Sequence, residues 1–240
     1  MSYLLYCIFR SPAQPSPGIP AGVGGKPVFV LAQNGLSAGL SELAEPDLLP
    51  DISQILAYEA VVEHLYRDLT VIPVRYGCQL AEASEALGLL ERHRDEYGAL
   101  LDEIEGLGEM GIHVLIDSSG AGTESDARPV PAKSFPLLVN SGAAYLVAMR
   151  ERYLGLDRAA LHERLLVEEI LGSLAGIYVR RKVEFPDLNR SRLLSLYFLV
   201  PRASVESFRR AARHLHPKES VKLLLSGPWP PYNFVDSLER

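Results

Sequence analysis

The stretch Asp51–Gly77, DISQILAYEAVVEHLYRDLTVIPVRYG, predicts one helix followed directly by one strand. In its first part, apolar side chains recur at steps of three and four residues, a spacing that places them on one face of a helix. This apolar stripe consists of Ile55, Tyr58, Val62, Leu65 and Leu69. Asp51 and Gln54 have the spacing of a capping box, which satisfies free backbone N–H groups at a helix start. We therefore expect a helix that begins at Asp51 and buries the stripe.

The period changes directly after this helix. Residues 70–72 are Thr-Val-Ile, and β-branched side chains favour a strand. Pro73 has no N–H to donate to a sheet, so a strand that contains it is expected at a sheet edge or at a bulge.

The composition is typical of a soluble globular protein. The chain has 240 residues, of which 48% are hydrophobic and 22% are charged, enough for one large domain or two small ones. No apolar run approaches the roughly 20 residues that span a bilayer, and the apolar residues 4–9 lack the features of a signal peptide. We expect a cytoplasmic protein without a membrane partner. In that compartment the two cysteines, Cys7 and Cys78, are expected to be free thiols.

Charge is distributed unevenly along the chain. Residues 1–117 contain 6 Lys or Arg and 17 Asp or Glu, whereas residues 118–240 contain 18 and 13. This asymmetry fits two solvated surfaces of different composition. It also fits two domains that attract each other or choose different partners.

The N-terminal part is predicted to be a mixed α+β domain. Strands are expected over residues 3–9, 28–33 and 36–43, and the helix and strand of the opening stretch follow. Asn34-Gly35 is a strong hairpin signal between the second and third of these strands. Ser84 is expected to cap one long helix that reaches Ile104. Glycines at 106 and 108 indicate a domain boundary, which gives an N-terminal domain over residues 1–107.

The C-terminal part has the predicted order β-α-β-β-α-β, which is the ferredoxin-like arrangement. Strands are expected over residues 109–117, 177–185, 192–200 and 221–225. The first connection is enlarged, because it holds a loop over 118–136, a helix from 140 or 141 to 153, and a helix from 157 to about 174. Residues 192–200 are apolar on both faces and predict a central strand. The fold class is therefore α+β, with a ferredoxin-like domain over residues 108–240.

The sequence predicts no catalytic, cofactor-binding or metal-binding residue. Gly106, Gly108 and Gly111 match a dinucleotide-binding fingerprint, but a helix precedes them and a strand follows, the reverse of the required context. His214 and His216 form a close pair without further ligands spaced to complete a metal site.

RNA binding is the alternative raised by the basic C-terminal part, since ferredoxin-like sheets can bind RNA through aromatic strands. The predicted central strand RLLSLYFLV lacks the RNA-recognition pattern. The net charge of −6 also argues against a nucleic-acid partner.

Two segments carry a resemblance to a known family. The first joins Tyr58-Glu59 to the strand TVIPVRYG at residues 70–77, and the second is GPWPPYNFV at residues 227–235. In these segments the chain resembles the gas vesicle accessory proteins of the F/L type, the GvpF/GvpL family. The second motif is the more specific, because prolines on both sides of a tryptophan are rare. Ser195-Leu196-Tyr197 departs from the small residues of the family's pattern there.

The resemblance implies a two-domain α+β protein without catalytic activity. It implies an accessory or minor structural protein of gas vesicle assembly, located in the cytoplasm and at the gas vesicle. The implied partners are the small hydrophobic shell protein and other gas vesicle accessory proteins. The alternative is a small-molecule enzyme with a site in the cleft between the domains. A tight polar pocket would favour the enzyme, and a shallow apolar patch would favour the binding protein.

Five motif residues are candidates for partner binding. They are Tyr58, Arg75, Tyr76, Trp229 and Tyr232. A core role is favoured for Tyr58, Pro73 and Trp229. The prolines around Trp229 impose an extended path without internal hydrogen bonds, so its ring is expected to be buried against its own domain.

Overall fold

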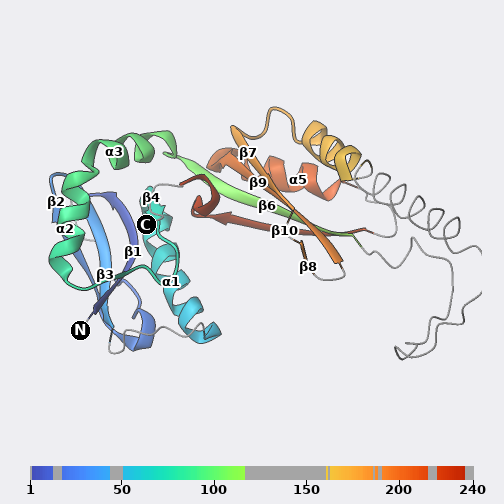
Figure 1. The fold of residues 1–240 in the computed structure, drawn as a ribbon. Helices are drawn as coiled ribbons and strands as arrows, with labels where there is room; N and C mark the ends of the chain where they lie inside the picture. The colour runs from blue at the N-terminus through green and yellow to red at the C-terminus, as the bar shows by residue number, and fades with distance from the viewer. Residues whose placement is uncertain are drawn as a thin grey trace, which may run out of the picture.

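Two antiparallel sheets, each flanked by helices, form the protein (Figure 1). The mixed α+β class is therefore confirmed. The predicted loop over 118–136 and the predicted helix that ends at 153 lie outside the described residues. The computed structural model describes residues 2–12, 18–43, 51–116, 161, 163–185, 187–188, 191–215 and 221–235.

The N-terminal sheet has the strand order β2-β3-β1-β4, and β5 also pairs with β1. Its strands are β1 (Ser2–Arg10), β2 (Val28–Gln33), β3 (Leu36–Leu43), β4 (Val71–Pro73) and β5 (Gln79–Leu80). Asn34 and Gly35 join β2 to β3 with φ angles of 51° and 84°. A two-residue hairpin turn requires such positive angles, so the predicted hairpin is confirmed.

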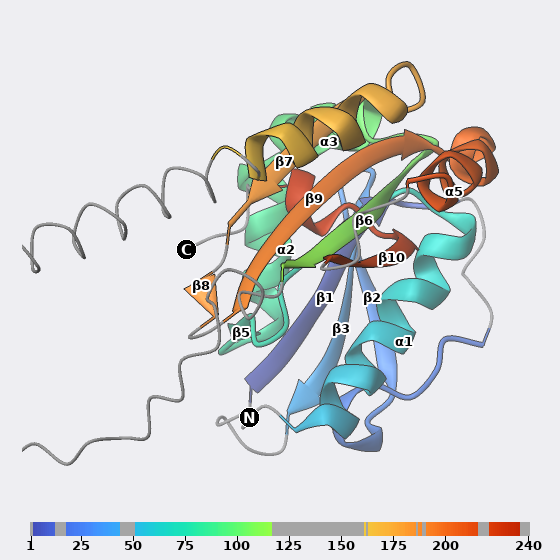
Figure 2. The same cartoon turned by 90° about the vertical axis from the view of Figure 1, so that its right-hand side faces the viewer.

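Helices cover both faces of this sheet (Figures 1 and 2). They are α1 (Ile52–Asp68) on one face and α2 (Ala83–Arg92) and α3 (Arg94–Glu103) on the other. Strand β1 is apolar along most of its length because it contributes to both cores. Leu5 and Ile8 pack with α2 and α3, whereas Tyr6 and Cys7 pack with α1. A shift of register between Leu5 and Cys7 lets two consecutive residues join the same core.

Helix α1 and strand β4 match the opening stretch closely. The Asp51 carboxylate accepts a hydrogen bond from the Ser53 N–H at 3.4 Å, which confirms the N-cap. The Gln54 side chain accepts a hydrogen bond from the Tyr76 hydroxyl at 3.0 Å instead of completing a capping box. Strand β4 lies at the sheet edge, as Pro73 predicts.

The single long helix expected from Ser84 to Ile104 is wrong. The chain forms α2 and α3, which meet at His93 with φ −108° and ψ 20°. The His93 Nδ1 atom lies 2.9 Å from a carboxylate oxygen of Glu96. Acidic residues in the first turn stabilise the start of a helix, so this break begins a new helix. The N-cap of α2 is Glu82, and Ser84 donates its hydroxyl to that carboxylate at 2.9 Å.

The C-terminal sheet has the strand order β10-β6-β9-β7, and β8 also pairs with β9. Its strands are β6 (Leu107–Ile116), β7 (Arg180–Glu184), β8 (Asp187–Leu188), β9 (Ser191–Pro201) and β10 (Val221–Trp229). Strand β9 lies between β6 and β7, which confirms the prediction of a central strand. Helix α5 (Val205–Arg213) and the helical residues 163–173 pack on one face (Figure 2).

Three strand boundaries differ from the expected ones by more than one residue. Strand β6 begins two residues early, at Leu107, and β7 begins three residues late, at Arg180. Strand β10 continues four residues beyond the expected end at 225. A register shift between Ser226 and Trp229 accommodates the interruption at Gly227 and Pro228 and lets pairing with β6 resume at Trp229.

The two cysteines differ in their exposure to solvent. Cys7 is buried, Cys78 is half-buried, and both are free. Within the described ranges, no helix has the length and apolar character needed to span a membrane.

Candidate functional site

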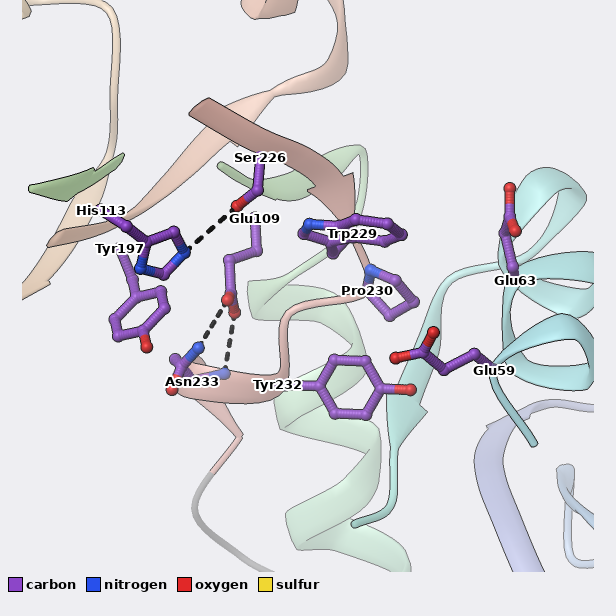
Figure 3. A pocket seen from close by; sticks show the side chains of 10 residues that line it. All are labelled: Glu59, Glu63, Glu109, His113, Tyr197, Ser226, Trp229, Pro230, Tyr232 and Asn233. Carbon is purple, nitrogen blue, oxygen red and sulfur yellow. Dashed lines mark hydrogen bonds between the residues drawn. The ribbon is translucent and has the colours of Figure 1, made fainter. Parts of the chain in front are cut away.

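A hollow of about 250 Å³ lies between α1 and the C-terminal sheet (Figure 3). Residues from α1, β6, β9, β10 and the short helix η4 (Tyr232–Phe234) form its wall. The wall residues are Glu59, Glu63, Glu109, His113, Tyr197, Ser226, Trp229, Pro230, Tyr232 and Asn233. This hollow is the candidate site.

The tail, defined here as residues 227–235, carries one wall of the hollow and connects the two sheets. Gly227 has φ +97°, and a Cβ there would lie 2.4 Å from the Glu109 backbone oxygen, so only glycine fits. Beyond β10, Tyr232 packs against the core under α1. Val235 joins the core between the N-terminal sheet and α2 and α3. The tail therefore starts in the C-terminal sheet and ends in the core of the N-terminal sheet.

Glu109 holds the tail in place. One of its carboxylate oxygens accepts from the Asn233 backbone N–H at 2.8 Å, and the other accepts from the Asn233 side-chain amide at 2.6 Å. The side chain is only 4% exposed. Burial raises the pKa of Glu109, while the two hydrogen bonds from Asn233 and the charge of Lys182 act in the opposite direction.

His113 forms the floor of the hollow together with neighbours on adjacent strands. Its Nδ1 lies 3.0 Å from the Ser195 hydroxyl. Its Nε2 lies 3.5 Å from the Ser226 hydroxyl (Figure 3). The ring meets Tyr197 edge to face, with 5.8 Å between ring centroids. Burial lowers the pKa of His113, so the neutral imidazole is favoured at neutral pH.

Helix α1 supplies the acidic wall. Glu59 and Glu63 lie one helical turn apart and are both exposed. Glu63 forms an ion pair with Arg67 at 3.5 Å. Among the described wall residues, none is lysine or arginine. Negative charge therefore dominates the hollow.

A family model described as gas vesicle synthesis protein GvpL/GvpF matches residues 2–236. The chain belongs to the GvpL/GvpF family. Gas vesicle protein F of a Streptomyces species is 26% identical to it, over 98% of this chain and all of the relative. Gas vesicle protein F1 of Halobacterium salinarum is 22% identical, over 89% of this chain and 83% of the relative. Membership assigns this chain to gas vesicle assembly.

Solved structures agree with the fold of this GvpL/GvpF member. The crystal structure of GvpF from an Anabaena species matches it with a TM-score of 0.73 at 16% identity, over 98% of this chain and 95% of that chain. The crystal structure of GvpF from Microcystis aeruginosa gives the same score and identity, over 98% of each chain. At this identity the likeness shows the fold alone.

Three of the five motif residues of this GvpL/GvpF chain lie in one aromatic cluster. Tyr58 is buried, stacks on Tyr6 with 4.8 Å between ring centroids, and meets the edge of Tyr76 at 5.4 Å. Tyr232 packs against the same cluster from the tail. Arg75 is exposed two residues beyond β4 and is not among the residues that line the hollow.

The expectation that the Trp229 ring is buried against its own domain is wrong. The ring is 44% exposed and lies along the hollow (Figure 3). The neighbouring Pro230 and Pro231 are buried instead. Because Tyr232 and Val235 make the core contacts, the extended tail is anchored without the tryptophan.

Sequence reasoning missed most of the hollow. Glu59 and Glu63 have helical spacing that indicates only a solvent-facing surface. The alternation of β6 contains a usable signal, since Met110, Ile112 and Val114 face the core. Glu109 and His113 therefore lie on the opposite face of the sheet. No pattern in the sequence indicates that this face meets α1.

Proposed function

We propose that this chain is an accessory or minor structural protein of gas vesicle assembly that binds the small hydrophobic shell protein and other gas vesicle proteins. It would act in the cytoplasm and at the gas vesicle, without catalytic activity. Membership of the GvpL/GvpF family supports the process. The binding role rests on one structural observation, the exposed apolar side chains beside the hollow.

These side chains lie on the face of the C-terminal sheet opposite α5. Leu115 is 36% exposed, Leu224 is 65% exposed and Trp229 is 44% exposed. Trp229 pairs with Glu109 and Leu224 pairs with His113, so both project from the face that carries the hollow. Exposed apolar groups that gather on one face are typical of protein-binding surfaces, and tryptophan is enriched among residues that dominate binding energy.

Capture of the shell protein tests this role. Trp229→Ala and Leu224→Ser are expected to melt close to the wild type and to capture less shell protein. Val30→Ala is the matched control, because Val30 is also exposed, at 40%, but lies on β2 of the other sheet. Capture should be unchanged by a chelator, since binding is proposed to need no metal. If both variants and the Val30→Ala control capture as much shell protein as the wild type, the proposal is contradicted.

We also infer that residues 1–107 form an N-terminal α+β domain and that residues 108–240 form a ferredoxin-like domain. The element order supports this division, because helical residues 163–173 precede β7 and α5 precedes β10. All neighbouring strands of the C-terminal sheet are antiparallel. Both features support the β-α-β-β-α-β pattern that we propose for this domain.

The alternative, a small-molecule enzyme, is favoured only by the position of the hollow between the two sheets. The arrangement of its polar groups weighs against catalysis. Both carboxylate oxygens of Glu109 accept hydrogen bonds from Asn233. Both ring nitrogens of His113 lie near serine hydroxyls. These groups therefore hold the tail and the sheet together.

A further inference from the structure

The hollow combines aromatic side chains with carboxylates. Trp229, Tyr197 and Tyr232 supply rings, while Glu59 and Glu63 supply carboxylates from α1. In Figure 3 the two glutamates lie on α1, across the hollow from the sheet residues. Aromatic faces attract cations through the ring quadrupole, and nearby carboxylates add attraction of the same sign. The hollow therefore has the chemistry of a site for an organic cation.

The charged groups around the hollow leave room for such a cation. Arg67 is paired with Glu63, but both side chains are more than half exposed, at 67% and 52%. Exposed pairs of this kind contribute at most about 1 kcal/mol, so an incoming cation can compete. Lys182 is paired with Glu184 at 3.2 Å on the neighbouring strand. The Glu59 carboxylate forms no ion pair in the described part of the chain.

The size of the hollow favours one side chain over a metabolite. Its volume is about 250 Å³, below the range of about 300–1,000 Å³ for pockets that bind drug-sized ligands. A guanidinium is planar, stacks on aromatic rings and pairs with carboxylates through two hydrogen bonds. The same chain shows the ring contact internally, where the Arg202 guanidinium lies over the Tyr66 ring, 4.1 Å from its centre.

We propose that the hollow binds an arginine side chain of a partner protein, with its guanidinium on Trp229 and paired with Glu59 and Glu63. The identity of the partner as a gas vesicle protein rests on the proposed function. The site itself does not, because its chemistry can be tested with a small arginine derivative.

Trp229 makes the test direct, because it is the only tryptophan of the chain. Its fluorescence is recorded while N-acetyl-arginine amide is added to the full chain at constant ionic strength. A saturable change is expected. N-acetyl-lysine amide should bind more weakly, and the uncharged N-acetyl-citrulline amide should give no saturable change. N-acetyl-tryptophan amide, titrated in parallel, corrects for collisional quenching.

Charge-neutral variants locate the site. The double variant Glu59→Gln, Glu63→Gln is expected to weaken the arginine response by about fivefold or more, the equivalent of one lost ion pair. Glu91→Gln, an exposed glutamate on α2, is the control and should respond as the wild type does. An absent arginine response would overturn the proposal, as would an equal response to lysine or citrulline, or an unchanged double variant.

Capture of the shell protein by the same variants separates this inference from the proposed function. If the arginine derivative does not bind while the wild-type chain still captures the shell protein, the arginine site is contradicted and the binding role is supported. If the arginine derivative binds while the wild-type chain captures no shell protein, the arginine site is supported and the proposed partner is contradicted.

Discussion

The hydroxyl of Tyr58 lies where three backbone carbonyl groups converge. It donates to the Val74 oxygen at 2.6 Å, and the oxygens of Tyr6 and Leu5 lie at 3.1 and 3.2 Å. Burial raises the pKa of this hydroxyl well above its usual value, so it stays protonated and remains a donor. One side chain of α1 thereby ties β1 to the residue after β4.

Tyr58→Phe is expected to destabilise the protein by about 1–3 kcal/mol, because buried carbonyl groups lose their donor while the ring is retained. The free energy of unfolding from denaturant titration measures this. Tyr3→Phe, at a half-buried position of the same sheet, should change it by no more than about 0.5 kcal/mol. Equal effects of the two substitutions would show that the Tyr58 hydroxyl contributes nothing specific.

His113 is expected to make the folded chain less stable as the pH falls. Burial lowers its folded-state pKa below the ordinary value of 6.5. The unfolded chain then binds a proton at a pH where the folded chain does not, so stability decreases from about pH 7 down through the folded-state pKa. His113→Gln should lose less stability than the wild type in melts between about pH 7.5 and pH 5. Identical pH dependence would refute this role.

At the scale of elements, Arg202 connects the C-terminal sheet to the end of α1. It lies in the short helix η3 (Arg202–Ser204), and its guanidinium donates to the Tyr66 carbonyl oxygen at 2.8 Å. In return, the Tyr66 hydroxyl donates to the Leu107 carbonyl oxygen at 3.1 Å. The last carbonyl groups of a helix have no partner within it, and a cation there is favourable.

Arg202→Ala is therefore expected to cost about 1 kcal/mol of stability, through the lost ring contact and hydrogen bonds. Arg202→Lys should recover only part of this, because an ammonium lacks the planar fork. Arg210→Ala, at an exposed position of α5, is the control. Calorimetry measures the stability of each variant. If Arg202→Ala is as stable as Arg210→Ala, the contact of Arg202 with Tyr66 does not stabilise the protein.

Periodicity predicted elements whose burial follows from their own sequence. Strand β1 and helix α1 are examples, since β1 is apolar along most of its length and α1 has a continuous apolar stripe. Periodicity failed where tertiary contacts determine the ends of an element. The break at His93 and the extension of β10 through Trp229 depend on neighbouring elements. The hollow could not be predicted, because Glu59 of α1 and Glu109 of β6 line the same hollow only after the two sheets dock.

For the whole molecule, the tail and a few polar contacts hold the two sheets together. Glu103 of the acidic half forms an ion pair with Arg180 of the basic half. The Arg180 guanidinium also lies 5.7 Å from the centre of the Phe234 ring. Phe234 and Val235 are buried, at 6% and 8% exposure. The apolar contacts of the tail should therefore outweigh the ion pair, since exposed pairs contribute little.

The double variant Phe234→Ala, Val235→Ala is expected to lose several kcal/mol of stability, on the order of 2 kcal/mol for each buried side chain. The docked tail should loosen, and small-angle scattering should show a larger radius of gyration. Trp229→Ala is the matched control from the same tail, and it should keep the wild-type melting temperature and radius. A wild-type radius and melting temperature for the double variant would show that the tail does not hold the sheets together.

The position of Val235 has a consequence for synthesis of the chain. It completes a core that also contains Leu5 and Ile8, near the other end of the sequence. Translation adds about 5–20 residues per second. Because more than 200 residues lie between Ile8 and Val235, Val235 is synthesised on the order of ten seconds or more after Ile8. During this interval the N-terminal sheet emerges with an unfinished apolar core. A nascent chain thus has an early, exposed state in which apolar surface is available to chaperones or to premature association.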